Sequence, residues 1–258
     1  MNRIDQLFNS LRHQNKKGLI GYLTAGDPDM DSSLKNFIIA AKAGVDILEV
    51  GVPFSDPTAD GPVIQAASQR ALSKGCNVYR VMRLVEQFRK NSNAPVILFG
   101  YANPFYRYGF ERLCKDAVKA GVDGLLVVDM PYEESEGFRK LAGKHGLDWI
   151  ILIAPTTDEK RARFLLKEAT GFVYYITVTG VTGTRKLVPS DVIPHIKQLR
   201  KITTLPIAAG FGISNGQQAA QIAKTTDAVV VGSSLIKAML NGKIEQFVRE
   251  IRSSLDRL

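Results

Sequence analysis

Short runs of apolar, often β-branched residues alternate along the chain with longer segments in which apolar positions recur every three or four residues. The short runs are typical of buried strands and the longer segments of amphipathic helices, so their alternation predicts a parallel sheet with crossover helices. Eight such units favour a closed barrel. The expected strands are residues 19–23, 46–50, 95–100, 124–128, 149–153, 172–176, 205–208 and 228–231.

An open, doubly wound sheet is the competing architecture for this pattern. Such a sheet usually carries a G-x-G-x-x-G turn after its first strand, and residues 21–24 read Gly-Tyr-Leu-Thr instead. The turn Ala-Gly-Val-Asp occurs at 43–46 and again at 120–123, with a weaker echo at 225–228. Repeated helix-to-strand turns indicate repeated βα units. We therefore predict an α/β fold consisting of a single (β/α)8 TIM barrel over residues 1–258.

The segment before the first strand has its own helical pattern. Ile4, Leu7, Phe8 and Leu11 share one face of residues 4–14. We expect an extra N-terminal helix that covers the bottom of the barrel.

The composition is that of an ordinary globular protein, with 45% hydrophobic and 23% charged residues. No apolar run approaches the roughly 18 residues that a membrane helix needs. The first residues lack the continuous apolar core of a secretory signal. Two cysteines, Cys76 and Cys114, are too few for a disulfide scaffold. These features predict a cytoplasmic protein without a membrane partner.

The formal net charge of +9 bears on the class of ligand. Lys and Arg are scattered among acidic residues instead of forming a basic run, so we expect no nucleic-acid partner. Steering of a phosphorylated substrate and plain solubility are the other uses of such a charge. The three histidines, His13, His145 and His195, match no metal-binding spacing, and we expect no metal.

Glu49 is the strongest catalytic candidate in the residues themselves. Active sites of βα barrels lie at the C-terminal ends of the strands, and Glu49 interrupts an apolar run near such an end. Alternation along the strand places its side chain inward with Ile47 and Gly51. Desolvation there would raise the pKa of the carboxyl into a range useful for proton transfer. The alternative is a buried carboxylate paired with a basic residue.

Two further acids follow strands. Asp60 lies in a loop, residues 53–62, that is stiffened by proline and suited to holding a second carboxylate over the site. Its alternative role is an interaction with the dipole at the start of the helix expected near Val63, and Asp56 has the same alternative. Asp129 ends the fourth strand and serves either the site or the packing of the adjoining loop.

Glycines after the last strands form a candidate phosphate site. Residues 210–214 read Gly-Phe-Gly-Ile-Ser, and residues 232–234 read Gly-Ser-Ser at the expected start of a helix. Glycines allow close backbone approach, and the helix start offers N–H and hydroxyl donors to an anion. A third glycine-rich segment, residues 179–185, lies in the long connection after the sixth strand and suits either a mobile lid or a plain surface loop.

Taken together, these segments resemble the tryptophan synthase α-subunit family. The most specific part is Leu-Glu-Val-Gly-Val-Pro-Phe-Ser-Asp-Pro at 48–57 followed by Ala-Asp-Gly-Pro at 59–62. The resemblance extends over nearly the whole chain, through the motifs at 26–28, 101–103, 129–131, 180–183, 210–214 and 232–233.

The resemblance implies a lyase that splits indole-3-glycerol phosphate into indole and glyceraldehyde 3-phosphate. By that resemblance Glu49 is the general acid and base, and Asp60 stabilises the indole nitrogen. Thr182 is expected in the lid. The indole pocket is expected to contain Tyr22, Tyr101, Asp129, Ile153, Tyr174 and Phe211. The phosphate is expected at Gly183, Gly212, Gly232, Ser233 and Ser234.

The same resemblance implies a partner. We expect a tryptophan synthase β subunit in an α2β2 tetramer, with pyridoxal phosphate in the β subunit alone and no cofactor in this chain. The loop at 53–60 is the expected communication element. Three alternatives stay open: a stand-alone indole-3-glycerol phosphate lyase, a regulatory phosphate-binding subunit, and a sugar-phosphate epimerase. Intact Glu49 and Asp60 argue against the second, and the absence of metal-binding histidines argues against the third.

Overall fold

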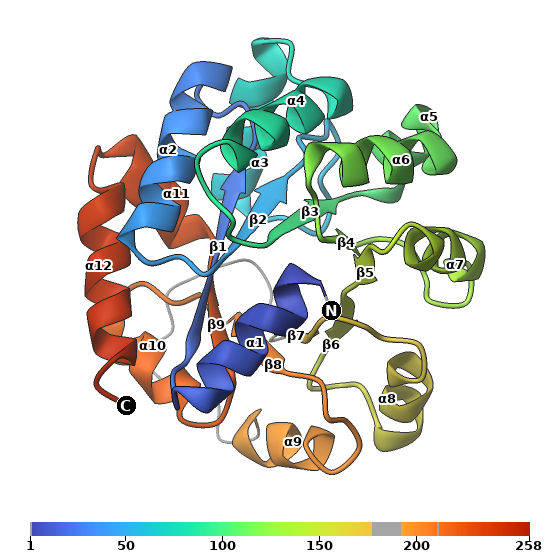
Figure 1. The fold of residues 1–258 in the computed structure, drawn as a ribbon, viewed down its shortest axis with the longest axis vertical. Coiled ribbons are helices and arrows are strands. Elements are labelled where there is room, and N and C mark those ends of the chain that lie inside the picture. The colour runs from blue at the N-terminus through green and yellow to red at the C-terminus, as the bar shows by residue number, and fades with distance from the viewer. Residues whose placement is uncertain (1, 177–191, 211) are drawn as a thin grey trace.

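The described residues of this computed structural model, 2–176, 192–210 and 212–258, form one parallel sheet with helices outside it (Figure 1). The strands are β1 (Gly18–Thr24), β2 (Ile47–Gly51), β3 (Val96–Gly100), β4 (Gly124–Val127), β5 (Asp148–Trp149), β6 (Ile151–Ile153), β7 (Val173–Ile176), β8 (Ile207–Gly210) and β9 (Ala228–Val231).

The strand order is β5-β4-β3-β2-β1-β9-β8-β7-β6, and its two ends are consecutive in the chain. Only Ile150 separates β5 from β6, and its N–H still donates to the Leu125 carbonyl at 2.9 Å. The fifth predicted strand is therefore one extended stretch with a break, and the sheet is a nearly closed barrel. The predicted TIM barrel is confirmed, with all eight expected strands present and the fifth divided in two.

Twelve helices occur in the described residues, and the long connection after β2 holds two of them. None of them is long and apolar enough to cross a membrane. The helices are α1 (Arg3–His13), α2 (Met30–Ala43), α3 (Pro62–Ser73), α4 (Val78–Arg89), α5 (Ala102–Tyr108), α6 (Phe110–Ala120), α7 (Glu136–Lys144), α8 (Glu159–Leu166), α9 (Val192–Leu199), α10 (Gly216–Ala223), α11 (Ser233–Leu240) and α12 (Ile244–Leu255).

The repeated turns noted in the sequence have a common structural use. Asp46, Asp123 and Asp227 each precede a strand, and each carboxylate accepts an N–H from the first or second residue of a neighbouring strand, at 2.7, 2.8 and 2.7 Å. Each also pairs with an arginine from an outer segment. The repeated aspartate thus joins one βα unit to the next, which is why the motif recurs at this position.

Helix α1 closes the N-terminal end of the barrel, as expected. Its buried residues Ile4, Phe8 and Leu11 pack with inward residues of the strands, including Ile20 and Phe172. In Figure 1 the helix lies across the centre of the ring of strands. The interior is therefore filled from below, which leaves the C-terminal end for function.

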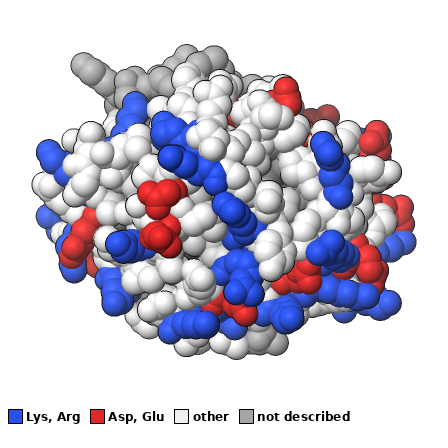
Figure 2. All heavy atoms as spheres, turned by 90° about the horizontal axis from the view of Figure 1, so that it is seen from above, with Lys and Arg blue, Asp and Glu red and all other residues white. Residues whose placement is uncertain are grey.

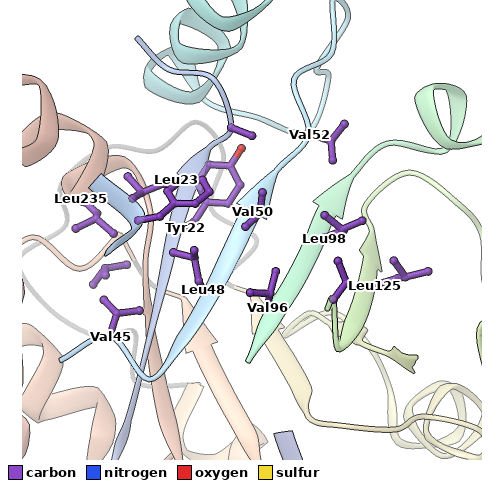
Figure 3. Packing of buried hydrophobic residues seen from close by; sticks show 14 of the residues in the cluster. Tyr22, Leu23, Val45, Leu48, Val50, Val52, Val96, Leu98, Leu125 and Leu235 are labelled. Carbon is purple, nitrogen blue, oxygen red and sulfur yellow. The ribbon is translucent and has the colours of Figure 1, made fainter. Parts of the chain in front are cut away.

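The larger apolar cluster lies between the strands and the surrounding helices. Figure 3 shows part of it, with Leu48 and Val50 of β2 beside Val96 and Leu98 of β3. Residues of β2 alternate between the two layers, because Ile47 belongs to the interior cluster. This alternation sets which side chains reach the mouth of the barrel.

Candidate active site

Glu49 occupies the inward position of β2 that alternation predicts, near the C-terminal end of the strand. It is 0% exposed, and neither carboxylate oxygen has a hydrogen-bond partner among the described residues. Burial raises the pKa of the carboxyl to about 8. The alternative of a carboxylate paired with a basic residue is therefore not seen here. A carboxyl in this setting holds its proton at neutral pH and can deliver it to a ligand.

Asp60 lies in the loop between β2 and α3, half-buried, and just before Gly61, the residue that begins the helix. The N-cap residue of α3 is Gly61, which makes no side-chain capping bond, so an interaction of Asp60 with the helix dipole stays the alternative for this residue. Burial raises the pKa of its carboxyl to about 6, against the opposing effect of a hydrogen bond from Tyr101. Asp60 is consequently ionised at neutral pH, where Glu49 is not.

Two tyrosines flank the acids. Tyr22 is paired directly with Glu49 in the β1–β2 register, and a Cβ at Gly51 would come within 2.2 Å of the Tyr22 hydroxyl. Its hydroxyl thus points toward the C-terminal ends of these strands (Figure 3). Burial, with Asp60 next in size, raises the pKa of Tyr22.

Tyr174 lies on β7, across the mouth of the barrel from Glu49. A Cβ at Gly210 would meet its hydroxyl at 3.0 Å, which places the ring against the end of β8. Burial raises the pKa of Tyr174 far above its usual range, and Glu49 is the next cause. Tyr22, Tyr174, Glu49 and Asp60 therefore share one neighbourhood.

Tyr101 follows β3 and contacts the loop that carries Asp60. Its hydroxyl accepts the N–H of Ala59 at 3.0 Å and donates to the Asp60 carboxylate. Its ring packs against Phe54 with centroids 5.2 Å apart. Tyr101 is thus placed beside Asp60 and holds the loop at both ends of residues 54–60.

Asp129 lies two residues beyond β4 and is exposed. Its carboxylate accepts the N–H of Ala102, the first residue of α5, at 2.7 Å. This contact agrees with the loop-packing alternative raised for Asp129. A place in the indole pocket stays a prediction for this residue.

Ile153 requires a correction. It is fully buried, but the β6–β7 register pairs Leu152 with Tyr174 and Ile153 with Tyr175. Leu152 and Tyr174 both pack against the cluster inside the barrel. The side chain that faces the interior from β6 is therefore Leu152, one position before the predicted residue. Phe99 of β3 also packs with the interior cluster and contacts Tyr22 edge to face at 5.0 Å. It was missed because its run is apolar throughout.

The candidate phosphate residues that the structure describes lie at the ends of β8 and β9. Ser233 and Ser234 form the first turn of α11, and Gly232 precedes them. A Cβ at Gly232 would have Tyr22 as its nearest neighbour, at 3.7 Å, so this glycine borders the tyrosine. Gly212 has a φ of +63°, and a Cβ there would meet no atom of the described residues within 4 Å. Free N–H groups at a helix start beside glycines favour binding of an anion.

Three predicted residues, Phe211, Thr182 and Gly183, lie outside the described residues. Among the described ones, no three His, Cys, Asp or Glu side chains form a group that could hold a metal ion. His195, for example, bonds the Tyr175 hydroxyl at 2.8 Å and the Thr157 carbonyl at 3.0 Å, which is a structural use.

The face in Figure 2 carries basic side chains interspersed with acidic ones. Four i,i+4 ion pairs in the described residues have both side chains more than half exposed, and they illustrate this mixing on single helices, for example Lys115 with Glu111. Such a surface favours solubility over a continuous basic binding face.

Comparison with known proteins adds to this geometry. The family model described as tryptophan synthase alpha chain matches residues 8–256. The tryptophan synthase alpha chain of Geotalea uraniireducens is 48% identical over 92% of this chain and 89% of its own length. That of Geobacter sulfurreducens is 44% identical over 99% of both.

Solved structures agree with the sequence relatives. Tryptophan synthase subunit alpha from Legionella pneumophila superposes with a TM-score of 0.92, at 38% identity and full coverage of both chains. A Mycobacterium tuberculosis tryptophan synthase chain gives 0.93 at 32% identity, over 98% of both chains. The resemblance that the motifs carried is thereby confirmed, and the chain belongs to the tryptophan synthase alpha chain family.

Proposed function

We propose that this chain cleaves indole-3-glycerol phosphate to indole and glyceraldehyde 3-phosphate, with Glu49 as proton donor and acceptor and Asp60 as the partner of the indole nitrogen. The observation that carries the assignment is the difference between the two acids. Burial holds the pKa of Glu49 at about 8 and that of Asp60 at about 6. One carboxyl is therefore protonated and the other ionised at pH 7, as acid and anionic partner require.

The reaction needs both states at once. Glu49 gives its proton to the ring carbon that bears the glycerol chain, which leaves positive charge on the indole nitrogen. The Asp60 carboxylate accepts a hydrogen bond from that N–H and stabilises the charge. Ionised Glu49 then removes the proton of the glycerol hydroxyl, the carbon–carbon bond breaks, and its electrons return to the ring. Indole and the aldehyde leave, and Glu49 is protonated again.

The remaining site residues bind and orient the substrate. Tyr22, Tyr101 and Tyr174 supply aromatic surface around the two acids, and Leu152 takes the place in the wall that was assigned to Ile153. The start of α11, with Gly232, Ser233 and Ser234, supports binding of the phosphate. Gly212, and the undescribed Gly183, Thr182 and Phe211, complete the proposed site by family resemblance.

The assembly is part of the proposal. Membership of the family supports a β-subunit partner, and we propose an α2β2 tetramer in the cytoplasm. Pyridoxal phosphate would belong to the β subunit, and the chemistry proposed for this chain needs no cofactor. The exposed residues Ser55, Asp56 and Thr58 of the loop next to Asp60 support its role as the element that communicates with the partner.

The experiment is indole release from indole-3-glycerol phosphate by the purified chain, with and without the β subunit from the same source. We expect slow release that rises strongly when β is added. Fast release by the chain alone would favour a stand-alone lyase. No release in either case would contradict the catalytic assignment and leave a binding or regulatory role.

A further inference from the structure

The hydroxyl of Tyr101 has two partners in the loop before α3. It accepts from the N–H of Ala59 and donates to the carboxylate of Asp60, because an ionised carboxylate can only accept. Both partners are adjacent residues of one loop. A single phenol group therefore fixes the backbone beside Asp60 and the direction of its carboxylate.

Tyr101 is itself held from the next strand along the barrel. It is the N-cap residue of α5, yet its own side chain makes no capping hydrogen bond. The first N–H of the helix, on Ala102, is satisfied by the carboxylate of Asp129 at 2.7 Å instead. This bond joins the segment after β4 to the residue that immediately follows Tyr101.

The contacts form a continuous series from one strand end to another. Asp129 holds Ala102, Tyr101 precedes Ala102, and the Tyr101 hydroxyl holds Ala59 and Asp60. We propose that Asp129 is a positioning residue that acts through the start of α5 and the Tyr101 hydroxyl to orient the Asp60 carboxylate toward the substrate. This proposal rests on the proposed role of Asp60.

The structure favours this role over a place for Asp129 in the pocket wall. Asp129 is exposed, and its carboxylate is already directed to a backbone N–H, whereas Tyr101 is buried at 2% exposure. The titratable groups that act on Tyr101 are Asp60 and Asp129, and those that sense Asp60 are Tyr101, Tyr22 and Tyr174. Tyr101 is the one among them that donates a hydrogen bond to Asp60.

The test is a double-mutant cycle of Tyr101→Phe and Asp129→Ala. Its readouts are the pH profile of kcat/KM and the pKa of Asp60 by carbon-13 NMR of its carboxyl group. The Tyr101 hydrogen bond lowers the pKa of Asp60. Tyr101→Phe keeps the ring and should move the acidic limb up by about one pH unit. It should also lower kcat/KM at least about tenfold.

Asp129→Ala should move the acidic limb and the pKa of Asp60 in the same direction by a smaller amount. It should cause no further movement when Tyr101 has already been replaced by Phe. Asp129→Asn retains an oxygen that can accept from Ala102, so it should stay close to the wild type. Glu111→Ala, which removes an exposed acid from the neighbouring helix α6, is the matched control and should leave the profile unchanged.

Independent, additive effects of the two substitutions would overturn the proposal, as would an unchanged Asp60 titration in both. A rise in KM without any movement of the acidic limb would also overturn it, because a wall residue acts in that way. Failure of the proposed role of Asp60 would appear separately, as wild-type turnover by Asp60→Asn. The NMR titration tests the contact series in either event.

Discussion

Glu49 and Asp60 are the same kind of group in two different surroundings. Glu49 lies on a strand inside the barrel, buried from solvent and without a polar partner among the described residues. Asp60 lies at the mouth and receives a hydrogen bond from a tyrosine. Desolvation acts on both, but the hydrogen bond opposes it only at Asp60. The different surroundings of the two carboxyl groups therefore keep Glu49 protonated and Asp60 ionised at neutral pH.

A bell-shaped pH dependence follows from these two values. Asp60 must be ionised and Glu49 protonated, so kcat/KM should fall below about pH 6 and above about pH 8. Each limb should approach a tenfold loss per pH unit. Measurement of indole release between pH 4.5 and pH 9.5 checks this, with circular dichroism to exclude unfolding at the extremes. Activity that keeps rising past pH 9 would contradict the assignment of Glu49 as the acid.

Glu49→Gln should abolish turnover and change stability in a pH-dependent way. Loss of the proton-transfer group should cost at least ~100-fold in kcat. The folded pKa of about 8 exceeds the ordinary 4.5, so the stability present below pH 4.5 is lost as pH rises through 8. Glutamine cannot ionise, so the Glu49→Gln variant does not lose this stability as the pH rises.

Urea unfolding at pH 5 and pH 8.5 measures that difference. The free energy of unfolding of Glu49→Gln should increase relative to that of the wild type as pH rises. Glu86→Gln, at a side chain that is 46% exposed, serves as control. If the stability of the Glu49 variant and of the wild type depended on pH equally, the Glu49 carboxyl would have to be solvated, which would contradict its burial.

Sequence alone could place Glu49 but not the wall around it. Glu49 interrupts an apolar run, so its presence marks the inward side of its strand. Residues 149–153 are apolar throughout because both faces of a barrel strand are buried, and such a run carries no alternation. Ile153 was therefore chosen where Leu152 faces the interior. The bond from Tyr101 to Ala59 joins residues 42 apart and has no local signal.

At the scale of elements, α3 is fixed to the end of β1 by one ion pair. Arg70 of α3 donates to both oxygens of Asp27 at 2.7 and 2.8 Å, and Asp27 is 1% exposed. The same helix begins just after Asp60. The pair thus joins the segment after β1 to the element that follows the catalytic loop.

Arg70→Ala should destabilise the protein by on the order of 3 kcal/mol, because it leaves a buried carboxylate without its partner. Denaturant unfolding measures this loss. The matched control is Arg163→Ala, which breaks a pair with Glu159 whose side chains are 58% and 63% exposed and should cost no more than about 0.5 kcal/mol. Similar losses in both variants would mean that Asp27 is solvated when Arg70 is removed.

Elements were easier to predict than their ends. Asp129 was expected to end a strand, but β4 ends at Val127 and the aspartate serves α5 instead. The break at Ile150 was not predicted either, since the hydrophobic pattern runs through it. Strand existence depends on composition, whereas a break depends on the geometry of closing the sheet.

For the whole molecule, the first and the last helix are both anchored to the barrel. Helix α12 packs on α2 and α10, and Arg252 of α12 pairs with Asp46 at 2.9 Å. Helix α1 is bound to the far side of the barrel base through Arg3 and Asp123 at 2.8 Å. These contacts support our proposal that residues 1–258 make one domain.

The pairing of β1 has a consequence for the order in which the protein is made. Gly18 of β1 is paired with Ala228 of β9, near the end of the chain. During synthesis on the ribosome, β1 is among the first strands to emerge. The edge of β1 that pairs with β9 stays unpaired until almost all of the chain has been translated. An unpaired edge can associate with other strands. The nascent chain is therefore most prone to aggregate before its last quarter, which contains β9, has been synthesised.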